Sequence, residues 1–582
     1  MPTFRSSGLL VAAVAAVVLL PNLGGPPLWD DDEPRNAACS LAMFHGGDWI
    51  VPTFNGRLRV EKPVLVNWLH LAGFAVAGVN ETGARLASAL LTIGTAVLSM
   101  QIARAIFRPE AGLWAGIVMA TCLWTGIAGR AATPDAALAF FTTLALWMFV
   151  RGARVAGPDG TRWRHGRVRL SPAAAGGIGV ACGLAVLAKG PVGLVLPLMA
   201  IGGFASWQSA ADPGLSGGRL ARLVRSLPAA WAGTRPLIIG AAAAAVAGPW
   251  YVLVSLRTDG VWLRDFVLVH NVARFAAPME GHSGSAFLYF PAVVLIGTFP
   301  WSMASALVAR HAARTVSSAS DDAVGMRLAA CWIAAWIVPF SLSGTKLPGY
   351  VWPAYPAIAA MVGLFVADWV RRPAPSTDRW MRVAWCLLAA SGIAIGAGLP
   401  LVAARFAPGA EWLGAIGLGP VLGAAVAWAC QSGASRQAAA AAWAATACGT
   451  VAVLVAVGPD CMGHAGGTRR LVAEIGAATT APPLASFAAP ASASFYAGRV
   501  AGPRGVTPLA HPAEAAAFIT ANPGGHVVVN ARFEETVLAN LPDDYGVLDA
   551  ATSFPSSQRV LLIGPQRAVR LADDATAPSS RR

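Results

Sequence analysis

Charged residues are scarce in this sequence. Asp, Glu, Lys and Arg together make up 12% of its 582 residues, whereas a soluble globular domain carries about 25%. Apolar residues make up 56%, and the mean hydropathy is +0.57. Few charges in a long apolar chain exclude an ordinary soluble protein and predict a polytopic membrane protein.

Paired cysteines and nucleic-acid motifs are also missing. The eight cysteines stand singly, with no CxxC and no pair at metal-ligand spacing, which favours neither a disulfide framework nor a zinc cluster. The formal net charge is +14. In a membrane protein, such an excess of basic residues indicates positively charged cytoplasmic loops and contact with anionic lipid. Because the sequence contains no nucleic-acid-binding motif, no nucleic-acid partner is expected.

Long apolar runs, in contrast, are abundant. About thirteen of them are long enough to span the hydrocarbon core of a bilayer. The first run lacks a small-residue cleavage pattern, so we interpret it as a retained anchor. The sequence predicts a mostly α-helical transmembrane domain over residues 1–458, with spans near 8–25, 83–106, 111–129, 134–151, 172–188, 190–207, 236–256, 285–308, 326–343, 347–369, 380–403, 411–430 and 437–457.

Arginine marks alternate turns between these runs. The arginine-rich turns lie at 104–108, 151–169, 219–235, 310–314, 371–382 and 436. The positive-inside rule places these turns in the cytoplasm. The loop 24–82, Asp135, Lys189, the loop 257–282 and Lys346 then share the extracytoplasmic side.

The loop 24–82 concentrates charge of both signs. Asp32 and Glu33 end a run of four acids beside the first apolar run, and Arg35 and Lys62 follow within the loop. A solvated helix cap is one interpretation of the acids. The neighbouring cations favour the other, a site that holds an anion beside a carboxylate.

The same loop contains two candidate interfacial helices. Residues 36–45 and 64–77 have the pattern of short amphipathic helices, and Pro63 suits the start of the second. A loop of this length is longer than a simple connection between two spans requires, which indicates a functional role.

Three further charges stand at the edges of apolar runs. Asp135 starts one run, where it could cap a helix, and Lys189 and Lys346 interrupt others, where a lysine could snorkel. Taken with Lys62, Arg35 and Arg274, the two lysines are better explained by a bound phosphate than by five unrelated placements.

A metal site has weaker support. Glu61 with His270 or His282 offers two ligands to a divalent cation, fewer than a protein metal site usually has.

Residues 459–582 predict a small extracytoplasmic α/β domain with a disordered tail at 575–582. Expected strands lie at 484–487, 526–530 and 560–563, and expected helices at 468–475, 512–521 and 535–541. This part contains no nucleophile elbow, glycine fingerprint or metal motif, so we expect it to have a supporting role.

Several short motifs occur together in a characteristic order. They are Asp32-Glu33-Pro34-Arg35, Gly47-Asp48-Trp49-Ile50-Val51-Pro52, Asn55-Gly56, Glu61-Lys62-Pro63, Ala84-Arg85-Leu86, Asp135, Leu187-Ala188-Lys189-Gly190-Pro191, Pro249-Trp250-Tyr251, His270-Asn271, Arg274-Phe275 and Lys346-Leu347-Pro348-Gly349-Tyr350. Over residues 10–370 this set resembles the GT-C membrane glycosyltransferases of family 83, which include the aminoarabinose transferase that modifies lipid A. More distantly it resembles the protein O-mannosyltransferases. The acidic run and Pro34 depart from the family pattern, which leaves the acceptor side open.

The resemblance implies a glycosyltransferase that uses a polyprenyl-phosphate sugar at the extracytoplasmic face of the bacterial inner membrane. The acceptor is a lipid, such as lipid A or another envelope glycolipid, or a protein, and neither nucleotide nor flavin is required. Asp32, Asp135 and Glu33 are the implied catalytic acids, with Asp32 accepting or orienting a hydroxyl proton. Arg35, Lys62, Lys189, Arg274 and Lys346 are the implied ligands of the donor phosphate. The alternative is a transporter or flippase that carries a lipid-linked sugar without chemistry.

Overall fold

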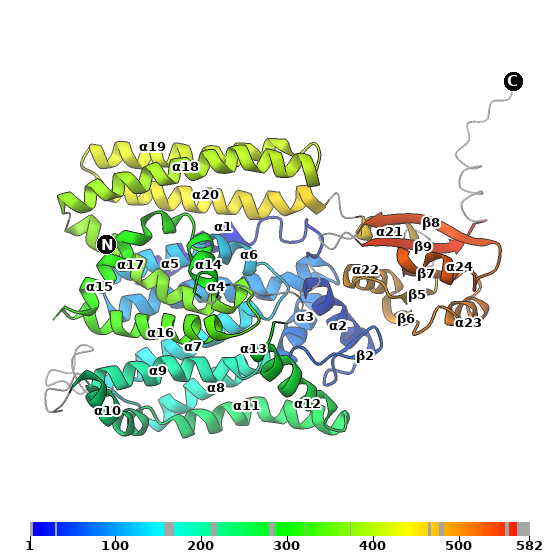
Figure 1. Cartoon of the computed structure of the whole chain (residues 1–582), viewed down its shortest axis with the longest axis horizontal. Coiled ribbons are helices and arrows are strands. Elements are labelled where there is room, and N and C mark those ends of the chain that lie inside the picture. Colours follow the sequence, from blue (N-terminus) through cyan, green and yellow to red (C-terminus); the bar gives the residue numbers. More distant parts are fainter. Residues whose placement is uncertain are drawn as a thin grey trace.

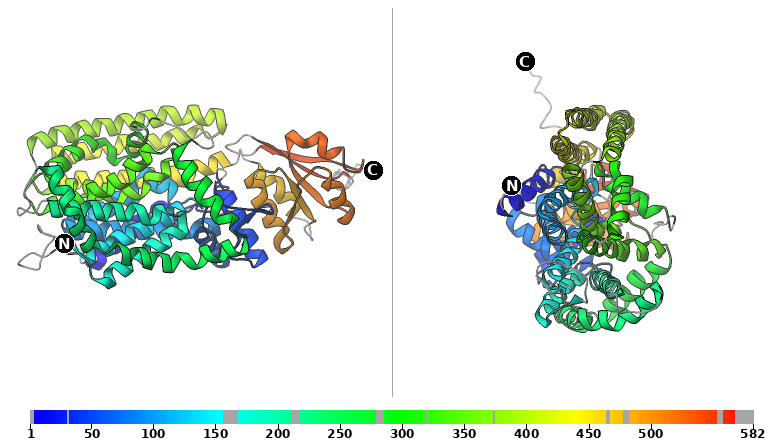
Figure 2. Two further views of the ribbon diagram at one scale, coloured as in Figure 1. Left: turned by 60° about the horizontal axis from the view of Figure 1, so that its bottom comes forward. Right: turned by 90° about the vertical axis from the view of Figure 1, so that its left-hand side faces the viewer.

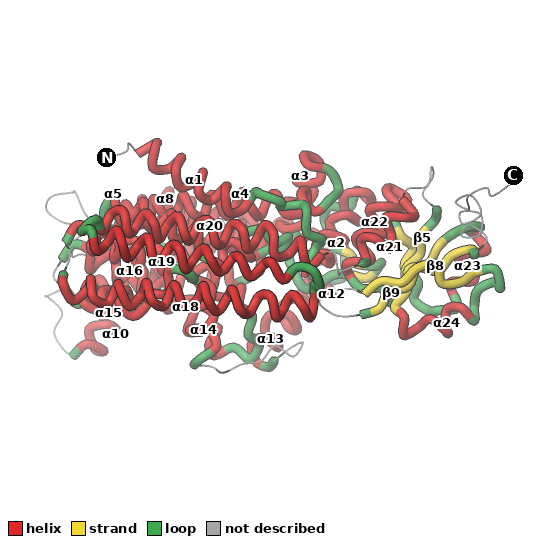
Figure 3. The backbone as a smooth tube through the Cα atoms, turned by 90° about the horizontal axis from the view of Figure 1, so that it is seen from above, coloured by secondary structure: helices red, strands yellow, loops and turns green. Residues whose placement is uncertain are grey.

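The computed structural model is an elongated helical bundle with a small mixed sheet at one end (Figure 1). It describes residues 4–29, 32–155, 168–210, 218–278, 285, 287–318, 320–372, 374–463, 467–476, 482–552 and 558–566. The N-terminus lies at the end of the bundle opposite the sheet. The five-stranded sheet lies at that one end in every view (Figures 2 and 3). The predicted polytopic, mostly α-helical architecture is confirmed.

Among the described residues, ten helices are long and apolar enough to cross a membrane. A pair bent by 115° at residues 298–300, α14 (Tyr289–Gly297) with η2 and α15 (Trp301–Val316), adds an eleventh if counted as one span. The ten are α4 (Glu81–Ile106), α7 (Asp135–Gly152), α8 (Pro172–Lys189), α9 (Val192–Ala210), α11 (Pro236–Arg257), α16 (Asp322–Leu342), η3 with α17 (Pro348–Arg371), α18 (Pro375–Phe406), η4 with α19 (Glu411–Ser432) and α20 (Arg436–Gly463), whose spanning part ends at Pro459.

The two other predicted spans are helical but shorter than expected. The run 8–25 forms α1 (Phe4–Leu19), whose 16 residues give a length of about 24 Å. The run 111–129 is divided into α5 (Pro109–Thr121) and α6 (Leu123–Ala128) because Cys122 is extended, at φ −67° and ψ 138°. The next amide, of Leu123, donates to the Phe299 carbonyl (3.0 Å) instead of continuing the helix. Apolar pattern alone does not reveal such a break.

Small residues allow these helices to pack closely, as expected in lipid. A Cβ added at Gly363 of α17 would lie 2.5 Å from the Ala111 carbonyl oxygen of α5. A Cβ at Gly183 of α8 would lie 2.7 Å from the Val246 Cβ of α11. A larger side chain at either glycine would therefore force two spans apart.

The first loop lies between the bundle and the sheet (Figure 1). It contains α2 (Asp32–Gly46), a hairpin of β1 (Thr53–Phe54) and β2 (Arg57–Leu58), and α3 (Leu65–Ala77). Both helices predicted in this loop are present, and α2 starts four residues earlier than predicted, at the acids. Buried polar contacts join α2 to α3: Asn67 Nδ2 donates to Ser40 Oγ (3.0 Å), and Ser40 Oγ lies 3.0 Å from His70 Nδ1.

Shorter elements complete the two ends of the bundle. They are α10 (Arg219–Thr234), α12 (Val261–Val267), the π-helix η1 (Leu268–Ala273), α13 (Arg274–Ala276), and the paired strands β3 (Arg154–Val155) and β4 (Val168–Arg169). The helix α10 lies at the end far from the sheet, and α12 and α13 lie near α2 and α3 (Figure 1).

The C-terminal sheet has the strand order β6-β5-β7-β9-β8. The strand β5 is parallel to β6 and β7, and β9 is antiparallel to β7 and β8. The elements are α21 (Thr468–Gly476), β5 (Leu484–Phe487), α22 (Ala491–Ala501), η5 (Gly502–Arg504), β6 (Val506–Pro508), α23 (Glu514–Ala521), β7 (His526–Asn530), η6 (Ala531–Phe533), α24 (Glu534–Leu538), β8 (Tyr545–Thr552) and β9 (Arg559–Pro565).

All three predicted strands of this region are present, and its predicted helices are also present, the last ending earlier than expected. The strands β6 and β8 and the helix α22 were not predicted from the sequence. The strand β6 is three residues at a sheet edge, and β8 is an edge strand with a register shift between Val547 and Asp549. Edge strands with half-exposed faces carry a weak apolar signal. The predicted disordered tail lies outside the described residues.

Candidate active site

A cavity of about 640 Å³ opens at the end of the bundle near the C-terminal sheet. Charged residues line one part of it, namely Asp32, Glu33, Lys62, Arg85, Arg130, Asp135 and Lys189, beside Tyr350. Apolar residues of later spans line another part: Leu399, Val402, Leu413, Ile416 and Leu454. A cavity with a charged head and a long apolar wall suits an amphiphile.

Asp32, the first residue of α2, is exposed to this cavity. No residue that the structure describes donates a hydrogen bond to its carboxylate. Burial among protein groups would raise the pKa of Asp32, but Lys62, Arg59, Lys189 and Arg35 outweigh this effect and hold it below its usual value. The carboxylate is therefore ionised at neutral pH and has lone pairs available to a ligand.

Lys62 also lines the cavity and follows the β1–β2 hairpin. Burial lowers the pKa of Lys62 to about 8, against the opposing effect of Asp32. An ammonium that is costly to bury gains more than a solvated one from an incoming anion.

Asp135 and Lys189 form an ion pair on the cavity wall. Lys189 Nζ donates to Asp135 Oδ1 and lies 5.2 Å from the centre of the Tyr350 ring. Asp135 opens α7 without a capping hydrogen bond from the preceding residue, and Lys189 ends α8, followed by Gly190 at φ 82°. The structure therefore pairs these two charges, whereas sequence analysis left helix capping and snorkelling open.

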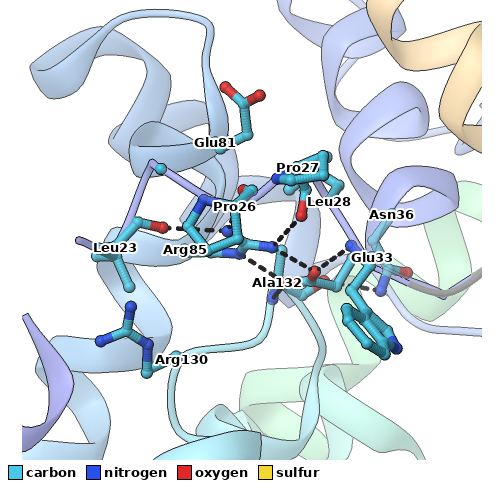
Figure 4. Close-up of polar contacts among 12 residues, drawn as sticks. Leu23, Pro26, Pro27, Leu28, Glu33, Asn36, Glu81, Arg85, Arg130 and Ala132 are labelled. Carbon is cyan, nitrogen blue, oxygen red and sulfur yellow. Dashed lines mark hydrogen bonds and ion pairs between the residues drawn. The ribbon is translucent and has the colours of Figure 1, made fainter. Parts of the chain in front are cut away.

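Figure 4 shows the surroundings of Glu33, the residue that follows Asp32 in the sequence. Its carboxylate accepts from Arg85 Nε (2.9 Å) and Nη2 (2.7 Å), and from the amides of Trp29 (2.6 Å) and Ala132 (2.7 Å). Burial opposes ionisation, yet these donors, Arg85 first, hold the pKa of Glu33 below its usual value. Glu33 is thus fully engaged within the protein.

Arg85 and Arg130 fix the chain that leads to Asp32. Arg85 donates to the carbonyls of Leu23 (3.1 Å), Pro26 (2.8 Å) and Pro27 (2.8 Å). Arg130 donates to the carbonyls of Leu19 (3.1 Å), Pro21 (2.7 Å) and Asn22 (3.0 Å). This segment has no regular secondary structure, so its backbone acceptors depend on these two buried guanidinium groups.

The backbone of Ala132 connects the start of α2, which carries Asp32, with the segment before α7, which begins at Asp135. The amide of Ala132 donates to Glu33, and the Ala132 carbonyl accepts from Asn36 Nδ2 (2.9 Å). Because Ala132 lies three residues before Asp135, α2 and the start of α7 are held at a fixed separation.

Arg59 was not singled out as a site residue. It is 3% exposed, donates to Asn36 Oδ1 (2.6 Å) and lies 3.4 Å from Glu61. Its charge contributes to the low pKa of Asp32. The burial of Arg59 in a charged loop leaves no local signal in the sequence.

Arg35, predicted as a phosphate ligand, lies near Asp32 and over the Phe54 ring (5.9 Å) but does not line the cavity.

The structure places the remaining two predicted phosphate ligands differently. Arg274 lies close to Tyr350, whose ring lies on the cavity wall. Lys346 is 4% exposed, and its ammonium donates to the carbonyls of Ser341 (3.0 Å) and Ser343 (2.6 Å) at the end of α16. The neighbours of Lys346, from Leu347 to Tyr350, line the cavity, whereas Lys346 itself does not.

Two of the three candidate metal ligands, Glu61 and His270, lie within the described residues. Glu61 pairs with Arg59, and His270 lies on η1, while His282 lies outside the described residues. Throughout the described part of the chain, no three His, Cys, Asp or Glu side chains are placed to hold a metal ion.

The C-terminal sheet region contacts the same loop through one buried acid. Glu81, the first residue of α4, is 2% exposed and accepts from Tyr496 Oη (3.1 Å) and Arg499 Nη1 (3.2 Å). Tyr496 Oη also accepts from the Leu28 amide (2.9 Å), and Arg469 donates to the Gly25 carbonyl (2.9 Å).

Comparison with known proteins agrees with this geometry. The family model described as dolichyl-phosphate-mannose-protein mannosyltransferase matches residues 43–234. The undecaprenyl phosphate-alpha-4-amino-4-deoxy-L-arabinose arabinosyl transferase of Pseudomonas paraeruginosa is 30% identical over 365 residues, which are 61% of this chain and 58% of the relative. That of Pectobacterium carotovorum is 30% identical over 66% of this chain and 62% of the relative. In sequence the chain thus matches about three fifths of the length of these relatives.

Among solved structures, the crystal structure of ArnT from Cupriavidus metallidurans bound to undecaprenyl phosphate superposes with a TM-score of 0.72. Sequence identity is 23%, and the superposition covers 96% of this chain and 98% of that one. This chain has the GT-C fold. The resemblance of the motifs to GT-C glycosyltransferases is therefore confirmed, and the GT-C architecture extends beyond residue 370, where the motifs end.

Proposed function

We propose that this protein is a glycosyltransferase that moves a sugar from a polyprenyl-phosphate-linked donor to a lipid of the envelope, such as lipid A, or to a protein acceptor. The observation that carries the proposal is the 640 Å³ cavity with Asp32, Lys62, Asp135 and Lys189 at its charged head and an apolar wall from α18, η4 and α20. A phosphate suits the head, and a prenyl chain suits the wall. The names of the aminoarabinose transferases, which include undecaprenyl phosphate, support the donor class.

The reaction is a single displacement at the anomeric carbon. An acceptor oxygen forms the new bond as the bond to the donor phosphate oxygen breaks, and the bonding electrons leave with the phosphate. Lys62 stabilises the negative charge that develops on that phosphate, and Lys189 adds a second cation within the same water-poor cavity. If the acceptor is a hydroxyl, Asp32 accepts its proton. If the acceptor is a phosphate, its oxygen is already ionised and no proton has to be transferred to Asp32.

The other predicted site residues receive graded roles in this proposal. Asp135 holds Lys189, and Glu33 holds Arg85 and the start of α2, so both act by positioning. Arg274 orients Tyr350, and Arg35 adds to the positive potential around Asp32. Lys346 fixes the turn before the cavity-lining segment 347–350 and does not contact phosphate.

A divalent metal is not assigned a role. Lys62 and Lys189 already supply cations where charge develops. We propose that transfer proceeds without added metal, which a titration with a chelator tests directly.

A transporter or flippase remains the alternative. Transporters bind their substrate near the middle of the membrane, on broken helices of related repeats. Here the charges gather at one end of the bundle, beside the C-terminal sheet, which favours chemistry at a membrane surface. By the arginine distribution we propose that this end is periplasmic and that residues 459–582 form a separate domain on the same side.

Reconstitution tests the proposal. Purified protein in liposomes should convert a synthetic polyprenyl-phosphate sugar and lipid A into glycosylated lipid A and free polyprenyl phosphate. Movement of the intact donor across the bilayer without product would support the transporter instead.

A further inference from the structure

A second and larger cavity, of about 1160 Å³, lies at the other end of the bundle. Parts of α9, α10, α11 and the end of α15 line it, and it shares no lining residue with the 640 Å³ cavity. Its walls are mainly apolar and include Leu198, Ile201, Trp207, Leu227 and Trp231. The proposed reaction makes no use of this groove.

The helix α10, which forms one wall, has the composition of a membrane-surface helix. It contains arginines and no acidic residue. Val224, Leu227 and Trp231 are 56%, 50% and 60% exposed. Basic helices with exposed apolar and tryptophan side chains lie at the boundary between headgroups and acyl chains.

Arg222 supplies the charge of the groove. It lines the cavity, and its Nε is buried without a hydrogen-bond partner in the described part of the chain. Among the described residues that line the groove there is no Asp or Glu. A buried guanidinium donor without a protein partner needs an anionic or water ligand, and an apolar groove favours one that brings its own hydrocarbon.

We propose that this groove binds an anionic glycerophospholipid from the leaflet at this end, which the arginine distribution makes cytoplasmic. The headgroup phosphate lies against Arg222, and acyl chains follow the apolar wall of α9 and Leu237 of α11. Basic pockets between helices on the cytoplasmic side are suited to such headgroups. A free anion would leave the exposed tryptophans and leucines uncovered.

Native mass spectrometry of the full chain in neutral detergent tests this proposal. Wild-type protein should retain phosphatidylglycerol in preference to phosphatidylcholine. Arg222→Gln should weaken phosphatidylglycerol retention about tenfold, since it removes a charge-assisted contact. Arg225→Gln, on the exposed face of the same helix, is the matched control and should change retention less than about twofold.

Three results would overturn the lipid site: unchanged retention in Arg222→Gln, equal retention of phosphatidylcholine, or displacement of phosphatidylglycerol by millimolar inorganic phosphate. If Arg222→Gln does not fold, Leu227→Gln replaces it, because Leu227 is half exposed and tolerates a polar side chain. Wild-type retention of phosphatidylglycerol in Leu227→Gln would contradict the proposed acyl-chain wall.

A separate set of contacts assigns a positioning role to the C-terminal sheet region. Tyr496 Oη joins the Leu28 amide to Glu81, and Arg469 joins the Gly25 carbonyl to Glu81. These backbone groups stand just before Asp32. We infer that Tyr496 sets the position of Asp32 relative to the donor, an inference that rests on the proposed glycosyl transfer.

Tyr496→Phe removes only the hydroxyl and tests that role. We expect kcat to fall about tenfold while the Kd for polyprenyl phosphate stays unchanged, because misplacement of a reacting group affects chemistry more than binding. Tyr545→Phe is the matched control, since Tyr545 Oη accepts from the Gly524 amide within the sheet region (3.2 Å). A wild-type kcat in Tyr496→Phe, with wild-type protein active, would refute the positioning role alone. Inactive wild-type protein would instead refute the proposed function.

Discussion

Asp32 and Glu33 are consecutive acids, yet they belong to two different regions. The Glu33 region is saturated, because Arg85 and two backbone amides occupy the carboxylate. The Asp32 region is unsaturated, with Lys62 nearby and no described donor on the carboxylate. A buried polar group that is fully hydrogen-bonded stabilises the fold, whereas one left open toward a cavity is available to a ligand. The difference separates the scaffold of the site from its chemistry.

Removing the open carboxylate should have the largest effect. We expect Asp32→Asn to lower the rate of transfer to a hydroxyl acceptor by about two to four decades, because the amide cannot accept the proton. The melting temperature should change little, since no described residue donates a hydrogen bond to this carboxylate. Single-turnover kinetics on a labelled donor measures the rate. A wild-type rate in Asp32→Asn would show that the acidic run only forms the start of helix α2.

Removing the saturated carboxylate should instead damage the fold. Glu33→Gln leaves Arg85 buried without its counter-charge, which costs about 3–5 kcal/mol of unfolding free energy. Glu110→Gln is the control, because Glu110 pairs with Arg371 at a more exposed position, where such pairs contribute about 0–1 kcal/mol. Equal melting temperatures for the two variants would contradict the assigned role of Glu33.

The lysine of the open region should bind the donor phosphate. Lys62→Met retains an apolar stem and removes a charge-assisted contact of about 1.5–3 kcal/mol. The Kd for polyprenyl phosphate should rise about ten- to a hundredfold. Isothermal titration in detergent measures it, and an unaltered Kd would remove Lys62 from the phosphate site.

The pH dependence of binding should show whether Lys62 is the cation that binds the donor phosphate. Burial lowers the pKa of Lys62 to about 8, so the free protein loses this cation as the pH rises through about 8. Affinity for polyprenyl phosphate should be full near pH 7 and fall toward pH 9. Lys62→Arg should remove the decline, because arginine stays protonated throughout this range. The same decline in Lys62→Arg would assign the titration to another group.

Lys346 should give the smallest effect on binding. Its ammonium is occupied by two carbonyls away from the cavity, so Lys346→Met should change the donor Kd less than about threefold. A larger loss in a variant with an unchanged melting temperature would restore Lys346 to the phosphate site.

The membrane architecture, the loop helices and most of the C-terminal strands could be predicted from the sequence. The period and the length of the apolar runs determine these elements locally. The sequence also singled out Asp32, Lys62, Asp135 and Lys189, which the fold brings to one cavity. It did not separate Asp32 from Glu33, nor Lys62 from Lys346. Those distinctions depend on Arg85, Ala132 and the end of α16, which are far apart in the chain and meet only after folding.

A structure of the protein with bound polyprenyl phosphate would test the central claim most directly. A phosphate oxygen should lie about 2.7–2.9 Å from Lys62 Nζ, with the Glu33–Arg85 pair unchanged. A phosphate bound to Arg85, with Glu33 displaced, would contradict the division between a saturated scaffold and an open reactive region.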